Sequence, residues 1–135
     1  MEKTFTAELV SLHPILDWIR KYLEDIGLST LEIRRIEIAL EEGLVNIFSY
    51  AYRGNTGSID ISISHQEGSH IAIIFKDTGR PFNPLKDGGK ADLLTPTDSL
   101  KEGGLGILLM QKLMDKVEYR REGNANVLTL RKNVP

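Results

Sequence analysis

The sequence predicts an α/β two-layer sandwich of the α+β kind, with three helices on one face of a mixed, mostly antiparallel sheet. Two observations predict this class. Three segments repeat apolar residues at helical spacing, and five shorter segments alternate or are apolar throughout, as strands do. Along the chain they run strand, helix, helix, strand, strand, long loop, helix, strand, strand. Because consecutive strands tend to pair with each other, most of the sheet should be antiparallel.

The bulk composition describes one ordinary globular domain over residues 1–135. Hydrophobic residues make up 41% of the chain and charged residues 27%, as in folded proteins. A net charge of -2 gives no general attraction to nucleic acid or to an anionic membrane, so neither is expected as a direct partner. With no cysteine, no membrane-spanning apolar run and no signal-peptide pattern at the start, we expect a cytoplasmic protein.

Short local patterns predict the strands and the first helix. Residues 4–10 alternate well enough for a short strand. Ser11 can then cap a helix that ends at Gly27. Four more strands are expected, at residues 58–65, 69–76, 117–121 and 127–131. The strand at residues 69–76 is apolar on both faces, which predicts a central position in the sheet.

The second helix carries two stripes of different chemistry. Ser29 and Glu32 form the pattern of a capping box, from which the helix should run to about Tyr52. Its apolar stripe consists of Ile33, Ile36, Leu40, Leu44, Ile47 and Ala51. Glu42 and Asn46, four residues apart, share another face. A carboxylate and an amide there could hold Mg²⁺, which takes few protein oxygens. The same spacing is common on solvated helix faces, so it does not decide the function alone.

Asp77 and Gly79 directly follow the predicted central strand, where sheets present ligand-binding loops. An aspartate there can accept a hydrogen bond from an exocyclic amine, and Gly79 lets the backbone approach a flat ring. A plain turn is the alternative interpretation. The chain then stays rich in glycine and proline as far as Gly104, and loops of this length are usually functional.

Gly103, Gly104 and Gly106, with Leu105 between them, open the third helix, expected over residues 105–114. Glycines at a helix start leave backbone N–H groups free to surround an anion, which the helix dipole also favours. The spacing fits neither a P-loop nor a dinucleotide-binding fingerprint. A simple glycine hinge is the alternative.

Taken in order, the three motifs resemble those of the GHKL ATPases, a superfamily that includes gyrase, sensor histidine kinases and heat-shock chaperone ATPases. Within it, the chain is similar to the single-domain anti-sigma factor serine kinases. The stretches that carry this resemblance are EEGLVNIFSYAYRG, KDTGRPFNP and EGGLGILLMQKLMD, and it covers essentially the whole chain. It implies the Bergerat ATP-binding fold, ATP and Mg²⁺ as cofactors, and serine/threonine-protein kinase activity in transcription regulation.

The resemblance also implies a role for each matching residue. Glu42 matches the catalytic general base, Asn46 the ligand of Mg²⁺ beside the ATP phosphates, and Asp77 the adenine-binding aspartate. Residues 85–102 match the ATP lid. The other implied nucleotide-binding residues are Gly79, Phe82, Gly103, Gly104, Leu105, Gly106 and Thr129.

Partners follow from the resemblance too: a sigma factor, an anti-sigma antagonist protein with a phosphorylatable serine, or both, and a homodimer is compatible with it. One departure is Tyr50, which stands where relatives commonly carry His or Asn, so the contacts near the phosphates can differ. The alternative function is an ATP-dependent protein-interaction module without kinase activity. A detached sensor-kinase ATPase domain and a structural protein that binds no nucleotide are further alternatives.

Overall fold

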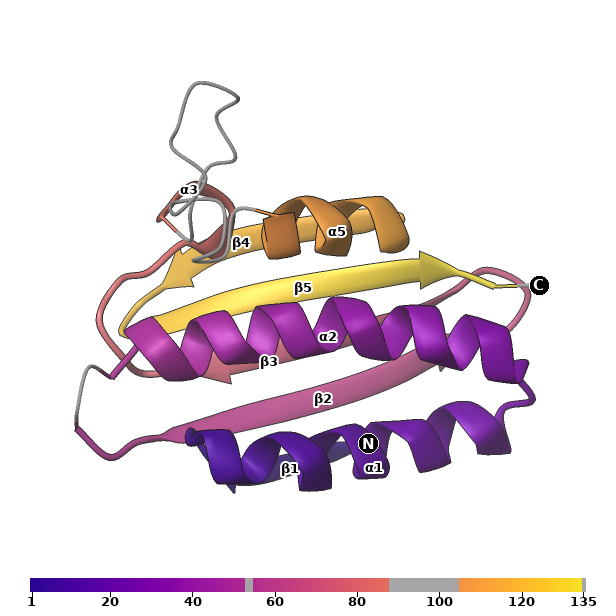
Figure 1. Cartoon of the computed structure of the whole chain (residues 1–135), viewed down its shortest axis with the longest axis horizontal. Helices are drawn as coiled ribbons and strands as arrows, with labels where there is room; N and C mark the ends of the chain where they lie inside the picture. Colours follow the sequence, from indigo (N-terminus) through magenta and orange to yellow (C-terminus); the bar gives the residue numbers. More distant parts are fainter. Residues whose placement is uncertain (53–54, 88–104, 135) are drawn as a thin grey trace.

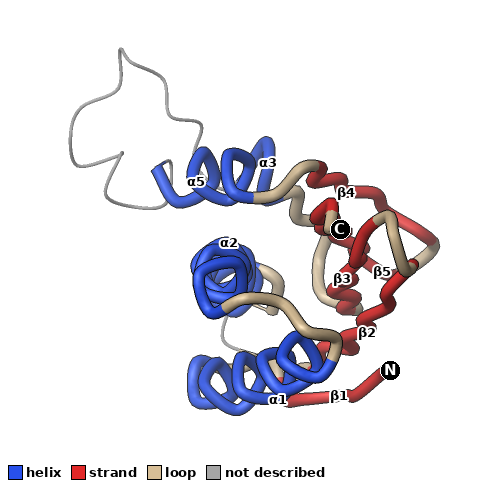
Figure 2. Tube along the Cα trace, turned by 90° about the vertical axis from the view of Figure 1, so that its right-hand side faces the viewer, coloured by secondary structure: helices blue, strands red, loops and turns tan. Residues whose placement is uncertain are grey.

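The computed structural model describes residues 1–52, 55–87 and 105–134, and these form two layers. Figure 2 shows the helices as one layer and the strands as the other. The α/β two-layer class predicted from the sequence is therefore confirmed. In these described ranges, no helix is long and apolar enough to cross a lipid bilayer.

The sheet has five strands in the order β1-β2-β3-β5-β4. They span Glu2–Thr6 (β1), Ser58–Gln66 (β2), His70–Asp77 (β3), Lys116–Glu122 (β4) and Ala125–Asn133 (β5). Each neighbouring pair of these strands is antiparallel, so the sheet is antiparallel throughout rather than mixed. β3 has a neighbour on each side, which agrees with the central position predicted from its two-sided apolar sequence.

Within the described residues, three main helices cover one face of this sheet, as expected (Figure 1). They are α1 (Leu12–Asp25), α2 (Thr30–Tyr50) and α5 (Leu105–Leu113). Two short elements were not expected from the sequence, a 3-10 turn at Leu9–Ser11 and the helix α3 at Pro84–Asp87. Both are one turn long or less, too short for any periodic pattern to indicate them.

Alternation along the strands decides which residues lie under the helices. The buried residues on this face of the three central strands are Ile59, Ile61 and Ile63 of β2, Ile71, Ile73 and Phe75 of β3, and Leu128 and Leu130 of β5. Because every second residue points to the same face, Asp77 continues the series of β3 and Asn126 that of β5. The two are directly opposite each other in the register, so both lie on the helical side.

Local capping explains where the first two helices begin and end. Both bonds of the capping box between Ser29 and Glu32 are present, and Gly27 takes a φ of 89° just after α1, as predicted. Ser11 occupies the N-cap position of α1, as predicted, but its side chain makes no capping bond. Its hydroxyl lies 2.7 Å from the hydroxyl of Thr6 instead.

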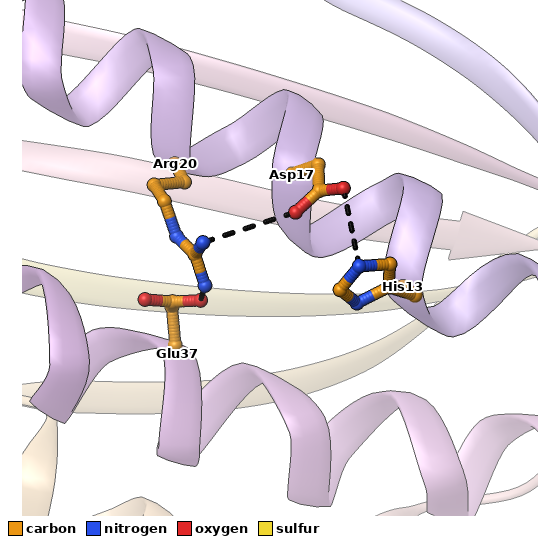
Figure 3. A network of polar contacts seen from close by, with 4 residues as sticks. All are labelled: His13, Asp17, Arg20 and Glu37. Atoms are coloured by element: carbon orange, nitrogen blue, oxygen red, sulfur yellow. Dashed lines mark hydrogen bonds and ion pairs between the residues drawn. The ribbon is translucent and has the colours of Figure 1, made fainter.

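An ion pair joins α1 to α2 (Figure 3). Glu37 of α2 is 8% exposed and pairs with Arg20 of α1, which also lies 3.9 Å from Asp17. The bond and the charge of Glu37 raise the pKa of Arg20. Glu37 and Asn46 are nine positions apart, which at about 100° per residue places them on opposite sides of α2. The side of α2 that carries Asn46 therefore faces away from α1.

Candidate functional site

Helix α5 packs closely against the Asn46 side of α2. Gly43 makes this approach possible, since a Cβ at that position would lie 3.3 Å from the sulfur of Met110. At the first turn of α5, a Cβ on Gly106 would overlap the carboxylate of Glu42. The structure thus brings together residues of two sequence motifs, with Gly106 of the glycine motif against Glu42 of the Glu42–Asn46 motif.

Asn46 is 4% exposed, although it is polar and lies away from the sheet-facing stripe. Its Nδ2 donates a hydrogen bond of 2.8 Å to the backbone carbonyl of Glu42, one turn earlier. This bond fixes the orientation of the amide and leaves Oδ1 as the oxygen that can accept a ligand. An oriented amide oxygen suits Mg²⁺, which completes its shell with water and phosphate oxygens.

Glu42 lies half-buried beside Asn46, at the edge of the α2–α5 contact. Burial raises the pKa of its carboxyl, and the neighbouring charge of Glu41 raises it further. A carboxylate whose pKa moves toward neutrality becomes a better proton acceptor, which is what general-base catalysis requires.

The second group of predicted residues lies at the end of β3. Asp77 is 3% exposed, and its Oδ1 accepts hydrogen bonds of 2.9 Å from the N–H of Gly79 and from Nδ2 of Asn126. Burial raises the pKa of Asp77, an effect that these two bonds and the charge of Arg121 partly offset. Both bonds end on one oxygen, so Oδ2 is the oxygen that a bound base could reach.

Gly79 and Phe82 fix the loop after Asp77 against the end of α2. A Cβ on Gly79 would overlap the backbone carbonyl of Ala51, so this close approach requires glycine. Phe82 is buried, and its ring stacks on that of Tyr50 with 5.0 Å between centroids. Tyr50, the departure noted in the sequence, therefore has a defined packing role here.

Sequence reasoning missed Asn126, which lies opposite Asp77 and is 3% exposed. The sequence does carry a signal for this residue. Asn126 stands two residues before Leu128 and four before Leu130, so on a strand it shares the face of these two core residues. A polar residue at such a position needs hydrogen-bond partners, and Asp77 is one of them.

The structure does not bring Thr129 to this site. Thr129 pairs with Ile74 and lies three residues along β5 from Asn126. Because successive side chains of a strand alternate between the two faces, this odd separation puts Thr129 on the sheet face opposite the helices. Gly103, Gly104 and residues 88–102 of the expected lid lie outside the described residues. Of Leu105, only the backbone is described, as the first residue of α5.

Comparison with known proteins identifies the family. Residues 5–132 match the model of histidine kinase-like ATPase domains. The chain is 32% identical over 101 residues to the serine-protein kinase RsbW of Oceanobacillus iheyensis, covering 72% of this chain and 63% of that protein. It is 34% identical over 100 residues to RsbW of Halalkalibacterium halodurans, with 72% and 60% covered. The match thus spans about three fifths of the length of these relatives.

Solved structures share the fold. The RsbU and RsbW domains of a Mycobacterium tuberculosis protein align with a TM-score of 0.63 at 13% identity, covering 100% of this chain and 33% of that one. The SiaB–SiaC complex of Pseudomonas aeruginosa aligns with a TM-score of 0.58 at 14% identity, covering 98% and 89%. Together with the family match over residues 5–132, these findings show that the chain belongs to the histidine kinase-like ATPase domains, the superfamily its sequence resembles.

Proposed function

We propose that this chain is a cytoplasmic, ATP- and Mg²⁺-dependent protein-serine kinase that acts as an anti-sigma factor. The observation that carries the proposal is the placement of Glu42 against the first turn of α5, with the oriented amide of Asn46 one helical turn away from it. Relatives named serine-protein kinase RsbW, at 32% and 34% identity, support the same reaction class. The substrate would be a serine of an anti-sigma antagonist protein, and the sequestered partner a sigma factor; the proposal is compatible with a homodimer.

In this proposal, the two groups of residues hold opposite ends of the nucleotide. Oδ2 of Asp77 accepts a hydrogen bond from the exocyclic amine of adenine. Asn46 holds Mg²⁺ through Oδ1, and the ion neutralises charge on the phosphates when bound. Gly103, Gly104, Leu105 and Gly106 would supply N–H groups to the phosphates, and residues 85–102 would close over them. The dipole of α5, which begins at Leu105, favours negative charge at that end.

Glu42 would act as the general base. Its carboxylate takes the proton of the substrate serine, whose oxygen forms a bond to the γ-phosphorus. The bond between that phosphorus and the β–γ bridging oxygen breaks, and ADP leaves with the bond's electron pair. The raised pKa of Glu42 supports this role, because a base with a pKa closer to neutrality takes up a proton more readily.

The test combines the purified chain, labelled ATP and candidate antagonist proteins, with phosphoserine as the readout. Glu42→Ala should cut phosphoryl transfer by roughly 100-fold or more while ATP affinity changes little, as expected when a general base is removed. Asn46→Ala should instead remove the Mg²⁺-dependent part of nucleotide binding. Glu67→Ala is the control, because it removes an exposed carboxylate in the turn between β2 and β3.

Two results would count against the proposal in different ways. Transfer by Glu42→Ala at the wild-type rate would exclude Glu42 as the base. ATP binding without phosphoserine on any candidate, in the wild-type chain, would favour an ATP-dependent interaction module without kinase activity.

A further inference from the structure

The amide of Asn126 is held in a single orientation by three donors. Its Oδ1 accepts hydrogen bonds from the N–H of Phe82 at 3.1 Å, the hydroxyl of Tyr119 at 2.6 Å and Nη1 of Arg121 at 3.2 Å. Arg121 is itself fixed, since the same nitrogen donates to the carbonyl of Gly79 at 2.8 Å. Only an oxygen can accept these bonds, so the amide nitrogen has to face the other way.

That nitrogen faces two acceptors. Nδ2 of Asn126 donates to Oδ1 of Asp77 at 2.9 Å and to the carbonyl of Arg80 at 2.8 Å, which uses both of its hydrogens. Oδ1 of Asp77 also accepts from the N–H of Gly79. With Oδ1 taken up by two donors, the carboxylate cannot turn without losing both bonds. The arrangement therefore leaves one oxygen, Oδ2, facing any bound base as an acceptor.

We propose that Asn126, oriented by Arg121 and Tyr119, is a positioning residue that sets the base specificity of the site at Asp77. By fixing Asp77 as a single acceptor, it selects a purine that carries a 6-amino group over one that carries a 6-oxo group. This inference rests on the proposed function, because it takes the base of ATP to lie at Asp77.

The physical basis is that two acceptors, Oδ2 of Asp77 and the 6-oxo oxygen of the base, would face each other without a hydrogen between them. The amino group of adenine donates to Oδ2, whereas the 6-oxo group of hypoxanthine presents a second lone pair to it. An unpaired buried acceptor costs the full desolvation of that group. A carboxyl that held a proton on Oδ2 could instead donate to the 6-oxo oxygen. The bond from Asn126 to Oδ1 stabilises the ionised carboxylate and so disfavours that proton.

The test measures the dissociation constants of Mg-ATP and Mg-ITP by titration calorimetry. The two bases differ in the group at C6 and in N1, which carries a hydrogen only in hypoxanthine. The wild-type chain should prefer ATP by roughly 10-fold to 100-fold, the range of one hydrogen bond to a charged group. Asn126→Leu removes the Nδ2 donor, so Oδ1 of Asp77 keeps only the bond from Gly79 and the carboxyl takes up a proton on Oδ2 more readily. The ATP preference should then shrink to about threefold or less. Asn124→Leu, the same change at an exposed position of the same hairpin, should keep the wild-type ratio.

A second variant keeps the test decisive if Asn126→Leu does not fold. The double substitution Tyr119→Phe with Arg121→Gln removes two of the three donors that orient the amide of Asn126. It should lower the ratio of the ITP to the ATP dissociation constant roughly fivefold. Equal weakening of ATP and ITP, or an unchanged ratio in the folded variants, would overturn the inference, because a merely structural role does not discriminate the bases. If the wild-type chain binds neither nucleotide, the proposed function itself fails.

Discussion

Asp77 is a buried charge that the fold tolerates at a cost. Its pKa is raised chiefly by burial, so the folded state holds its proton more tightly than the unfolded chain does. Between the unfolded and the folded pKa the folded state binds more protons, and stability therefore falls as pH rises through that window. At neutral pH the ionised carboxylate remains a net cost, which Asn126, Gly79 and Arg121 reduce.

Asp77→Asn should separate the cost of the buried charge in folding stability from the role of Asp77 in ATP binding. The new side chain can still accept bonds from Gly79 and Asn126 through Oδ1, but it carries no charge. We expect the melting temperature without nucleotide to stay equal or rise, while ATP affinity falls by roughly 10-fold or more. Thermal unfolding and calorimetric titration of the same sample measure both. A variant that unfolds at a clearly lower temperature would mean that the charge is needed for folding rather than for binding.

The contact between α2 and α5 places Glu42 of α2 beside Gly106 in the first turn of α5. Gly43 permits the close approach, and Gly106 leaves the space that the Glu42 carboxylate fills. The ion pair between Arg20 and Glu37 joins α2 to α1 on its other side. α2 is therefore packed on two flanks as well as on the sheet, which suits a helix that has to present Glu42 and Asn46 at fixed positions.

Gly106→Ala tests this packing. In an ordinary exposed helix the change would stabilise by about 1 kcal/mol, because alanine is the better helix former. Here the added Cβ would overlap the Glu42 carboxylate, so Glu42 has to move. We expect phosphoryl transfer at saturating ATP to fall by roughly 10-fold or more, without a gain in melting temperature. Leu108→Ala, at an exposed position of the same helix, serves as the control. A stabilised Gly106→Ala variant with wild-type transfer would contradict the contact.

At the scale of the whole molecule, local sequence patterns were sufficient to predict the main helices and the strands. The site residues whose place depends on strand pairing could not be predicted from them. Helices and strands could be predicted because apolar periodicity and the capping box at Ser29 are properties of neighbouring residues. Asn126 and Thr129 show the limit, since their roles depend on how β5 is registered against β3. That register puts Asn126 beside Asp77 and turns Thr129 to the other face.

Nucleotide binding should be visible in the stability of the whole molecule. A ligand that binds only the folded state at 100 times its dissociation constant stabilises it by about 2.7 kcal/mol. For a domain of this size that is a rise in melting temperature of roughly 8 °C. Mg-ATP should produce this shift in a thermal unfolding experiment, and Asp77→Asn should largely lose it. ATP with a chelator provides the magnesium-free comparison. The absence of any shift at millimolar Mg-ATP would count heavily against nucleotide binding.

The pairing of β3 with β5 also bears on how freely the chain can change in length. Asp77 and Asn126 touch across 49 positions of sequence, so their contact forms only when a long loop closes. The entropy of closing such a loop grows with the logarithm of its length, and doubling it costs only about 0.6 kcal/mol. Insertions or deletions that leave α5 and β4 intact therefore change the free energy of this pairing little. The part of the chain between the two ends of the site can vary in length while the carboxylate at Asp77 keeps its partners.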